Sequence, residues 1–222
     1  MVKLLLRALA AFLSGFIVVA TLLFLPAGTL RYTNGWLFIG LLFVPILLLG
    51  IVLFVKAPDL LRKRLRAKEK EQTQKGVIAL SALLFLAGFI VAGLDRRFGW
   101  SRVPAWAVTV ASAILLISYA LYAEVMRENV YLSRTVEIQK GQRVIDSGLY
   151  GMIRHPMYAA TVWLFLSIPI VLGSWWSLLA FSPYVFVIVV RILNEEKVLT
   201  EGLDGYADYT RRVKYRLIPF IW

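Results

Sequence analysis

The sequence contains no cysteine and only one histidine, His155, among its 222 residues. Without thiols, the chain can form no disulfide, no thiolate nucleophile and no cysteine-ligated metal site. A single imidazole is also too little for a histidine-rich metal centre, and no carboxylate pattern indicates a Mg²⁺ or Ca²⁺ site. We therefore expect a protein that uses no metal.

Charged residues are scarce as well, at 17% of the chain, whereas 60% of the residues are hydrophobic. A soluble domain of this length would need far more polar residues to cover its core. Apolar runs of about twenty residues recur, which is typical of membrane-spanning helices. The sequence therefore predicts an all-α integral membrane protein of about six apolar helices, the last two forming a short hairpin, at residues 4–25, 36–55, 77–94, 104–123, 158–172 and 175–190.

Two of these runs need comment. Run 4–25 has the charge-then-apolar order of a signal peptide, but it is longer than a signal core and lacks a clear cleavage site, so we expect a retained span. Run 158–172 would rise only about 22 Å as a helix, against a hydrocarbon layer of about 30 Å. It is compatible with a tilted helix, with a helix extended by its polar flanks, or with a short hairpin formed with run 175–190.

The basic residues indicate the orientation of the chain. One side of the predicted membrane receives Lys3 and Arg7, the loop 56–75, the polar segment 124–155 and the tail from Glu195. The other side receives only Arg31, Arg96, Arg97 and Arg102. Because cytoplasmic loops are enriched in Lys and Arg, we expect a multi-pass protein with both termini in the cytoplasm. The net charge of +12 then reflects topology and contact with anionic membrane lipids rather than binding to nucleic acid.

Three polar segments flank the last two apolar runs. They are "VEIQKGQRVIDSGLYGMIRHPMY" at 136–158, "RILNEEKVL" at 191–199 and "GYADYTRRVKYRLIPFIW" at 205–222. All three lie on the predicted cytoplasmic side, so they can converge into one pocket. We therefore divide the chain into four N-terminal spans, residues 1–123, and a C-terminal region, residues 124–222, that carries the polar loop, the hairpin and the tail.

The ordered pattern "GLY…RHPMY", an apolar hairpin, "R…NEE..L" and "GY.DY..RV..R.IP" resembles the isoprenylcysteine carboxyl methyltransferase family. That family is related to membrane phospholipid methyltransferases, which share the RHP-x-Y and Glu-Glu elements. The resemblance covers residues 136–219. It implies an integral membrane enzyme with a cytoplasmic-side S-adenosylmethionine pocket in region 124–222 and a lipid-like or prenylated substrate that arrives from the bilayer.

The resemblance also implies roles for individual residues. The implied cofactor-binding residues are Gln139, Gln142, Arg143, Val144, Ile145, Tyr150, His155, Pro156, Met157, Tyr158 and Glu195. Arg191 matches an arginine placed near the substrate, and Arg191, His155 and Glu196 are our candidate catalytic residues. One position departs from the pattern: Ala160 replaces a usual glycine, and its methyl group could narrow the helix packing or the pocket without removing activity.

The residue types suit this cofactor on chemical grounds alone. S-adenosylmethionine needs an acid for its ammonium group or ribose hydroxyls, donors for its carboxylate, and aromatic or aliphatic walls for adenine. These types are supplied by Glu195 or Glu196, His155, Tyr150, Tyr158, Val144 and Ile145. The neighbouring Tyr206, Tyr209 and Arg216 are expected to support the site through packing of the tail.

The acceptor decides which further chemistry is needed. A carboxylate is already ionised near neutral pH, so positioning is then the main task, and Arg191 could hold it through a two-pronged contact. An amine or thiol acceptor would need a base such as His155 or Glu196. We expect methyl transfer to a prenylcysteine carboxylate, with a phospholipid amine or small thiol as the alternative acceptor.

Each of these residues also has a structural interpretation. Arg154 and His155 could contact lipid phosphate, and the glutamate pair could be solvated acids at a helix end, although the helix dipole disfavours acids there. Arg191 could extend to the interface or pair with Glu195 along a helix. A non-catalytic scaffold or a transport component is the alternative class of protein. Ionisable residues gathered at one face, rather than in mid-span, count against transport.

Overall fold

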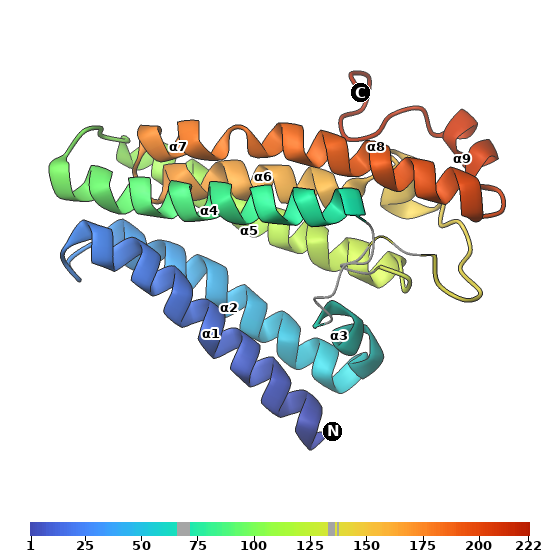
Figure 1. Ribbon diagram of the computed structural model, residues 1–222, viewed down its shortest axis with the longest axis horizontal. Coiled ribbons are helices and arrows are strands. Elements are labelled where there is room, and N and C mark those ends of the chain that lie inside the picture. The colour runs from blue at the N-terminus through green and yellow to red at the C-terminus, as the bar shows by residue number, and fades with distance from the viewer. Residues whose placement is uncertain (66–71, 133–135, 137) are drawn as a thin grey trace.

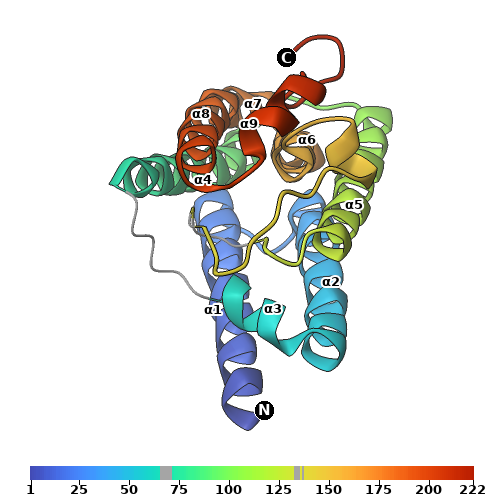
Figure 2. The same cartoon turned by 90° about the vertical axis from the view of Figure 1, so that its right-hand side faces the viewer.

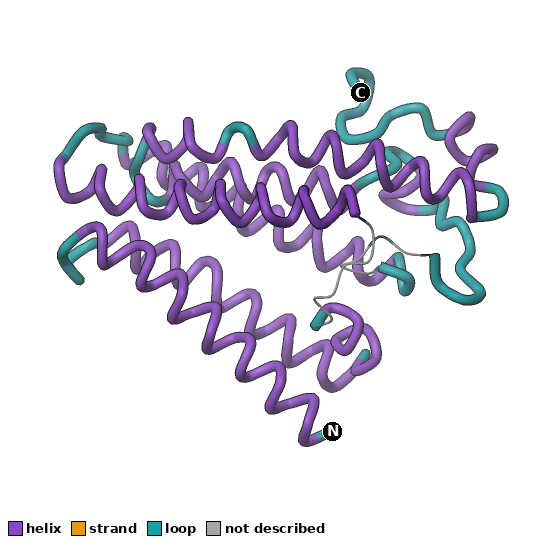
Figure 3. Tube along the Cα trace, in the orientation of Figure 1, coloured by secondary structure: helices purple, strands orange, loops and turns teal. Residues whose placement is uncertain are grey.

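The computed structural model describes residues 1–65, 72–132, 136 and 138–222. Its helices are α1 (Val2–Ala27), α2 (Thr33–Lys56), α3 (Pro58–Arg64), α4 (Gln72–Phe98), α5 (Ala105–Glu128), the 3₁₀ turn η1 (Gly148–Gly151), α6 (Pro156–Val171), α7 (Trp175–Phe181), α8 (Tyr184–Gly202) and α9 (Tyr206–Arg212). Within these described ranges the remaining residues are turns and loops, and no strand is present (Figure 3).

In the described part of the chain, five helical segments are long and apolar enough to cross a membrane: α1, α2, most of α4, α5 and the stretch Trp175–Gly202. The shorter α6 is also apolar. This arrangement confirms the predicted all-α, multi-pass membrane protein, because each predicted apolar run lies in one of these segments.

The prediction of a short final hairpin is wrong in one of its two arms. Helix α6 is indeed short, with 16 residues. Its partner spans 28 residues, because α7 and α8 follow each other after a break at Ser182 and Pro183, where proline cannot donate a backbone hydrogen bond. Helix α8 does not stop with the apolar run at residue 190, since the following "NEEKVL" consists mostly of good helix formers. Glu195 and Glu196 therefore lie inside a helix and not at its end.

The helices form two groups (Figure 1). Helices α4, α5, α6 and α7–α8 lie together, and the α1–α2 hairpin crosses them, meeting them at one end and diverging toward the N-terminus. At the meeting point α1 packs closely on α4: a Cβ on Gly93 would lie 2.6 Å from the carbonyl oxygen of Leu23. Small residues are what allow such close backbone approach between membrane helices.

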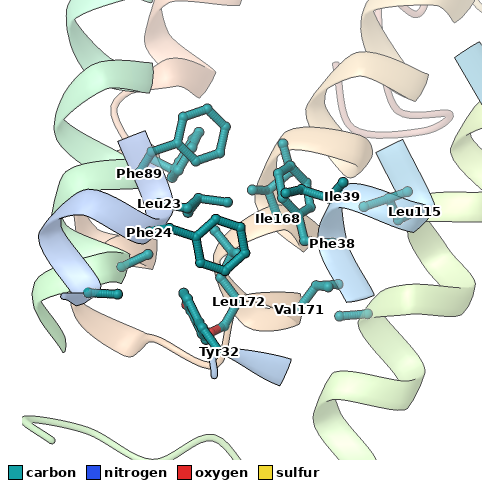
Figure 4. Close-up of a cluster of buried hydrophobic side chains, with 14 of the residues drawn as sticks. Leu23, Phe24, Tyr32, Phe38, Ile39, Phe89, Leu115, Ile168, Val171 and Leu172 are labelled. Carbon is teal, nitrogen blue, oxygen red and sulfur yellow. The ribbon is translucent and has the colours of Figure 1, made fainter. Parts of the chain in front are cut away.

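A cluster of buried hydrophobic side chains joins the two groups (Figure 4). It takes Leu23 from α1, Phe38 from α2, Phe89 from α4, Leu115 from α5 and Ile168 from α6. This cluster holds the α1–α2 hairpin to the rest of the molecule at the end away from the N-terminus.

The chain thus has two unlike ends. The C-terminal tail, the segment after α5, α9 and the N-terminus lie toward the same end of the long axis, which we call the terminal end (Figure 1), and the two termini are far apart across that end (Figure 2). The connections α1–α2, α4–α5 and α6–α7 lie at the opposite end, which we call the turn end. The sequence segments expected on the cytoplasmic side therefore gather at the terminal end.

The turn end is organised around Asp95, which is only 2% exposed. Its carboxylate accepts hydrogen bonds from the backbone N–H of Ser101 (2.7 Å), the hydroxyl of Ser101 (2.5 Å) and the hydroxyl of Ser174 (2.5 Å). Ser174 also caps α7 by accepting from the N–H of Ser177 at 3.0 Å. One buried acid thereby ties the end of α4 to the start of α7.

Two side chains from the start of α2 complete this end. The hydroxyl of Tyr32 donates to the carbonyl of Leu172 at 2.6 Å, and the amide of Asn34 donates to the carbonyl of Val171 at 2.9 Å. These carbonyls belong to the last turn of α6, where they lack helical partners. The C-terminal end of α6 is therefore fixed to α2.

Candidate functional site

A pocket opens at the terminal end, and it contains about 850 Å³ of empty space when the open solvent at its mouth is counted. Its walls come from the segment after α5, η1, the start of α6, α8 and α9. Ten of the predicted site residues line it: Gln142, Arg143, Val144, Ile145, Tyr150, His155, Met157, Tyr158, Arg191 and Glu195. Residues far apart in the chain are thus brought into one cavity.

Three predicted site residues, Gln139, Pro156 and Glu196, are not among the lining residues. The side-chain amide of Gln139 donates to the carbonyl of Tyr131, and its backbone N–H donates to the side chain of Gln142 at 2.8 Å. Pro156 is the first residue of α6, where a missing N–H costs nothing. Both residues shape the segments that carry the pocket.

Glu196 contacts the side chains of two arginines and one histidine beside the pocket. Its carboxylate lies 2.9 Å from Nε of Arg154, 3.1 Å from Nε2 of His155 and 2.9 Å from Nε of Arg216. The same segments also pair through their backbones, because the N–H groups of Arg154 and His155 donate to the carbonyls of Tyr215 and Arg216, each at 2.9 Å. Glu196 therefore fastens the start of α6 and the C-terminal tail to α8.

Glu195, by contrast, lines the pocket. It accepts a short hydrogen bond from the hydroxyl of Tyr158, and that hydroxyl accepts one from Nε of Arg191 at 2.8 Å. Adjacent residues on a helix point about 100° apart, so the two glutamates face different partners. The arrangement holds Arg191 and Glu195 on the same wall, with the buried phenol of Tyr158 between them.

The turn that leads into the RHP motif is built around Gly148. Its φ is +56°, and a Cβ there would lie 1.7 Å from the carboxylate of Glu128. That carboxylate accepts the backbone N–H of Leu149 at 3.0 Å. The position requires glycine because it needs a left-handed conformation and space for Glu128.

Tyr150 connects this turn to both α5 and α9. Its hydroxyl accepts a hydrogen bond from the amide of Asn129 at 2.9 Å, and its carbonyl accepts one from the hydroxyl of Tyr209 at 2.8 Å. Burial is the main cause that raises the pKa of the Tyr150 phenol, so the ring stays neutral. The wall that Tyr150 provides is therefore aromatic and fixed on two sides.

Three buried side-chain atoms in the described part of the chain have no hydrogen-bond partner: Nε of Arg154, Nδ2 of Asn194 and the hydroxyl of Tyr206. Arg154 and Tyr206 line the pocket. The contact between Arg154 Nε and Glu196 is short enough for an ion pair but lacks the alignment of a hydrogen bond. Buried polar groups without partners are rare, and at a pocket they indicate a ligand.

Sequence reasoning did not assign a ligand-binding role to several lining residues. Besides Arg154, they are Asn129, Tyr131, Leu132, Val136, Leu199, Leu203, Tyr206 and Tyr209. We had expected Tyr206 and Tyr209 to pack the tail; they do pack with Leu203 and Val213, and they also face the pocket. The signals available were the position of Arg154 beside His155 and the three-residue spacing of the two tyrosines, which places them on one helix face.

Comparison with known proteins adds a family match. Residues 105–204 match the model of a family described as phospholipid methyltransferase. The matched part runs from the start of α5 to just beyond α8 and includes most of the pocket. It supports a membrane methyltransferase.

Two individual proteins are also similar to this chain. The chain is 27% identical to Delta(14)-sterol reductase TM7SF2 of Mus musculus over 95 residues, 40% of this chain and 22% of the reductase. It is 26% identical to the uncharacterized protein YpbQ of Bacillus subtilis (strain 168) over 126 residues, 56% of this chain and 73% of that protein. The chain thus covers about a fifth of the reductase and most of the bacterial relative.

The pocket fits the cofactor that the resemblance implies. The lining residues Glu195 and Arg154 supply both signs of charge, and Tyr150, Val144 and Ile145 supply aromatic and aliphatic surface. In the described ranges, no three acidic or histidine side chains gather as a metal-binding group would.

Proposed function

We propose that this protein is an S-adenosylmethionine-dependent methyltransferase that acts on a lipophilic acceptor at the membrane. The observation that carries the proposal is the shared pocket: His155 from the RHP motif, Glu195 from α8 and Tyr206 from the tail line one cavity. The family match over residues 105–204 supports the reaction class. In this proposal residues 124–222 form the catalytic region and residues 1–123 are mainly membrane helices that support it.

Different lining residues would bind different parts of the cofactor. Glu195 would hold its ammonium group or ribose hydroxyls, Val144 and Ile145 would contact the adenine, and Tyr150 would form a fixed wall. When bound, the cofactor supplies an electrophilic methyl group. The protein itself orients the acceptor and keeps the reacting groups aligned, which is the main requirement of an in-line displacement.

The acceptor that Arg191 favours is a carboxylate, as in a prenylated cysteine. Arg191 lines the pocket and is held at Tyr158, so its guanidinium is positioned to bind a planar anion. A phospholipid amine is the second candidate, favoured by the family match. For an amine or thiol, a proton must leave, and His155 is the pocket-lining base, with Glu196 3.1 Å from its Nε2.

The terminal end would face the cytoplasm in this proposal. The excess of Lys and Arg in the segments that meet there supports that orientation. Membrane lipids would surround the apolar helices, and the acceptor would reach the pocket from among them.

Binding and labelling together test the proposal. Purified protein in detergent should give a calorimetric signal with S-adenosylmethionine, and membranes incubated with the methyl-labelled cofactor should yield a labelled lipid-soluble product. Base-labile label would identify an ester and hence a carboxylate acceptor, whereas base-stable label would identify an amine or thiol. Absence of any cofactor binding would refute the methyltransferase.

The substitution Arg191→Ala tests how the acceptor is held. If Arg191 binds a carboxylate, its loss should lower acceptor turnover about a hundredfold while cofactor affinity changes much less, since a charge-assisted two-pronged contact is worth a few kcal/mol. Lys197→Ala, an exposed change on the same helix, is the matched control and should leave turnover intact. Equal losses of turnover and cofactor affinity would contradict this role.

A further inference from the structure

Two donors that line the pocket have no hydrogen-bond partner in the described part of the chain, although Nε of Arg154 lies in an ion pair with Glu196. Tyr206 is 4% exposed and Arg154 is 9% exposed, yet the hydroxyl of the first and Nε of the second lack hydrogen-bond partners. Leaving such groups buried without partners costs free energy. A pocket lined by both residues is the place where a ligand would satisfy them.

Packing of α9 does not require the hydroxyl of Tyr206. Its ring lies against Tyr209, with centroids 5.7 Å apart, and both rings belong to the hydrophobic cluster with Leu203 and Val213. The hydroxyl of Tyr209, three residues later, donates a hydrogen bond to the carbonyl of Tyr150. A phenylalanine would pack at position 206 equally well, so the hydroxyl there is available for another purpose.

The groups around Glu196 carry more positive charge than its single carboxylate balances. One carboxylate faces two permanently charged guanidiniums, those of Arg154 and Arg216, together with the imidazole of His155. Burial, and then the negative charges of Glu196 and Glu195, raise the pKa of Tyr206, so its phenol stays a neutral donor. A guanidinium and a phenol on one pocket wall are suited to bind a carboxylate.

Glu195, also on the pocket wall, has the opposite charge. A ligand that satisfies both sides carries an anionic and a cationic group close together, as the α-amino acid end of S-adenosylmethionine does. We propose that Arg154 and Tyr206 bind the α-carboxylate of the cofactor, and that Glu195 faces its α-ammonium group. This inference rests on the proposed function and assigns a ligand group to two residues outside the predicted site.

A pair of cofactor analogues tests the assignment without turnover. S-adenosylhomocysteine keeps the whole amino acid end, and its decarboxylated form lacks only the carboxylate. By calorimetry in detergent, the unmodified protein should bind the first roughly tenfold more tightly or better, as expected for hydrogen bonds to a charged group. Tyr206→Phe should lower the affinity for S-adenosylhomocysteine by roughly tenfold and leave the affinity for the decarboxylated analogue unchanged.

Arg154→Gln is the second variant, and Glu196 keeps His155 and Arg216 as partners when it is made. It should remove the preference for the carboxylate at least as completely, and it decides the question if Tyr206→Phe does not fold in a thermal melt. Tyr209→Phe is the matched control: it frees the carbonyl of Tyr150 and should weaken both analogues alike by disturbing η1.

The outcomes separate this inference from the proposed function. If Tyr206→Phe and Arg154→Gln weaken both analogues by the same factor, or if the unmodified protein binds both equally, the carboxylate assignment is wrong while cofactor binding stands. If the unmodified protein binds neither analogue nor S-adenosylmethionine, the proposed function itself is wrong. Selective loss of S-adenosylhomocysteine binding supports the assignment.

Discussion

The two ends of this protein treat buried polar groups in opposite ways. At the turn end, the side chains of Asp95, Ser174 and Tyr32 are all hydrogen-bonded to other parts of the chain. At the terminal end, within the described residues, the hydroxyl of Tyr206 has no hydrogen-bond partner beside the pocket, and Nε of Arg154 has only an ion pair with Glu196. The turn end also has a hollow, but Tyr32, Asn34, Asp95 and Ser101 in its walls are already bonded.

This difference separates structure from binding. A buried polar group whose partners all belong to the protein stabilises the fold, and its removal should lower stability alone. A buried polar group that lacks a partner lowers stability until a ligand arrives, so its removal should affect binding first. Substitutions at the two ends can test this distinction directly.

The largest expected effect is at the turn end. Asp95→Ala removes the acceptor of three hydrogen bonds, from half-buried Ser101 and from buried Ser174, so we expect a loss of about 3 kcal/mol in the free energy of unfolding. Unfolding in mixed detergent measures it. Asp59→Ala removes an exposed acid that pairs only with Arg62 and should cost about 0.5 kcal/mol or less. A specific fall in cofactor affinity for the folded Asp95 variant would break the comparison.

Glu196→Gln should have an intermediate effect of a mixed kind. It leaves Arg154, His155 and Arg216 without their shared counter-charge, so we expect about 2 kcal/mol of lost stability, together with weaker cofactor binding because the start of α6 and the tail shift. Melting and calorimetry on the same sample measure both. The control Glu201→Gln changes an exposed acid on the same helix. Reduced turnover with normal stability and normal binding would instead make Glu196 a catalytic residue.

The smallest expected effect is Glu195→Gln. The amide oxygen can still accept a hydrogen bond from Tyr158, so stability should hardly change. The loss of charge should lower the affinity for S-adenosylmethionine by about tenfold, or about 1.4 kcal/mol. Calorimetry measures the affinity and a thermal melt the stability. An unchanged affinity with a lower melting temperature would assign Glu195 to the fold and would blur the contrast between the ends.

The membrane architecture could be predicted from the sequence because it depends on local composition. A run of about twenty apolar residues must form a helix in lipid wherever it packs, so the class of fold and the positions of the apolar segments followed directly. The end of α8 did not follow, since the apolar signal stops at residue 190 while the helix continues to Gly202.

The candidate site could be predicted only in part. Motif order indicated which segments converge, and His155, Tyr158 and Glu195 do line one pocket. Which of two neighbouring glutamates faces that pocket depends on how α8 is rotated against α6, and this is a property of tertiary packing. The lack of a partner for the hydroxyl of Tyr206 could not be predicted for the same reason, because only the folded chain shows that no group in its described part bonds to it.

The shortness of α6 has a consequence for how an acceptor would be recruited. Its 16 residues rise about 24 Å, less than the thickness of a typical hydrocarbon layer, and Tyr32 and Asn34 hold its far end at the turn end. Under the proposed function, His155 and Tyr158, at the near end of α6, would lie below the membrane surface. Because each methylene moved into water costs about 0.8 kcal/mol, such a recessed pocket would let a lipid acceptor enter laterally with its tails still in the bilayer.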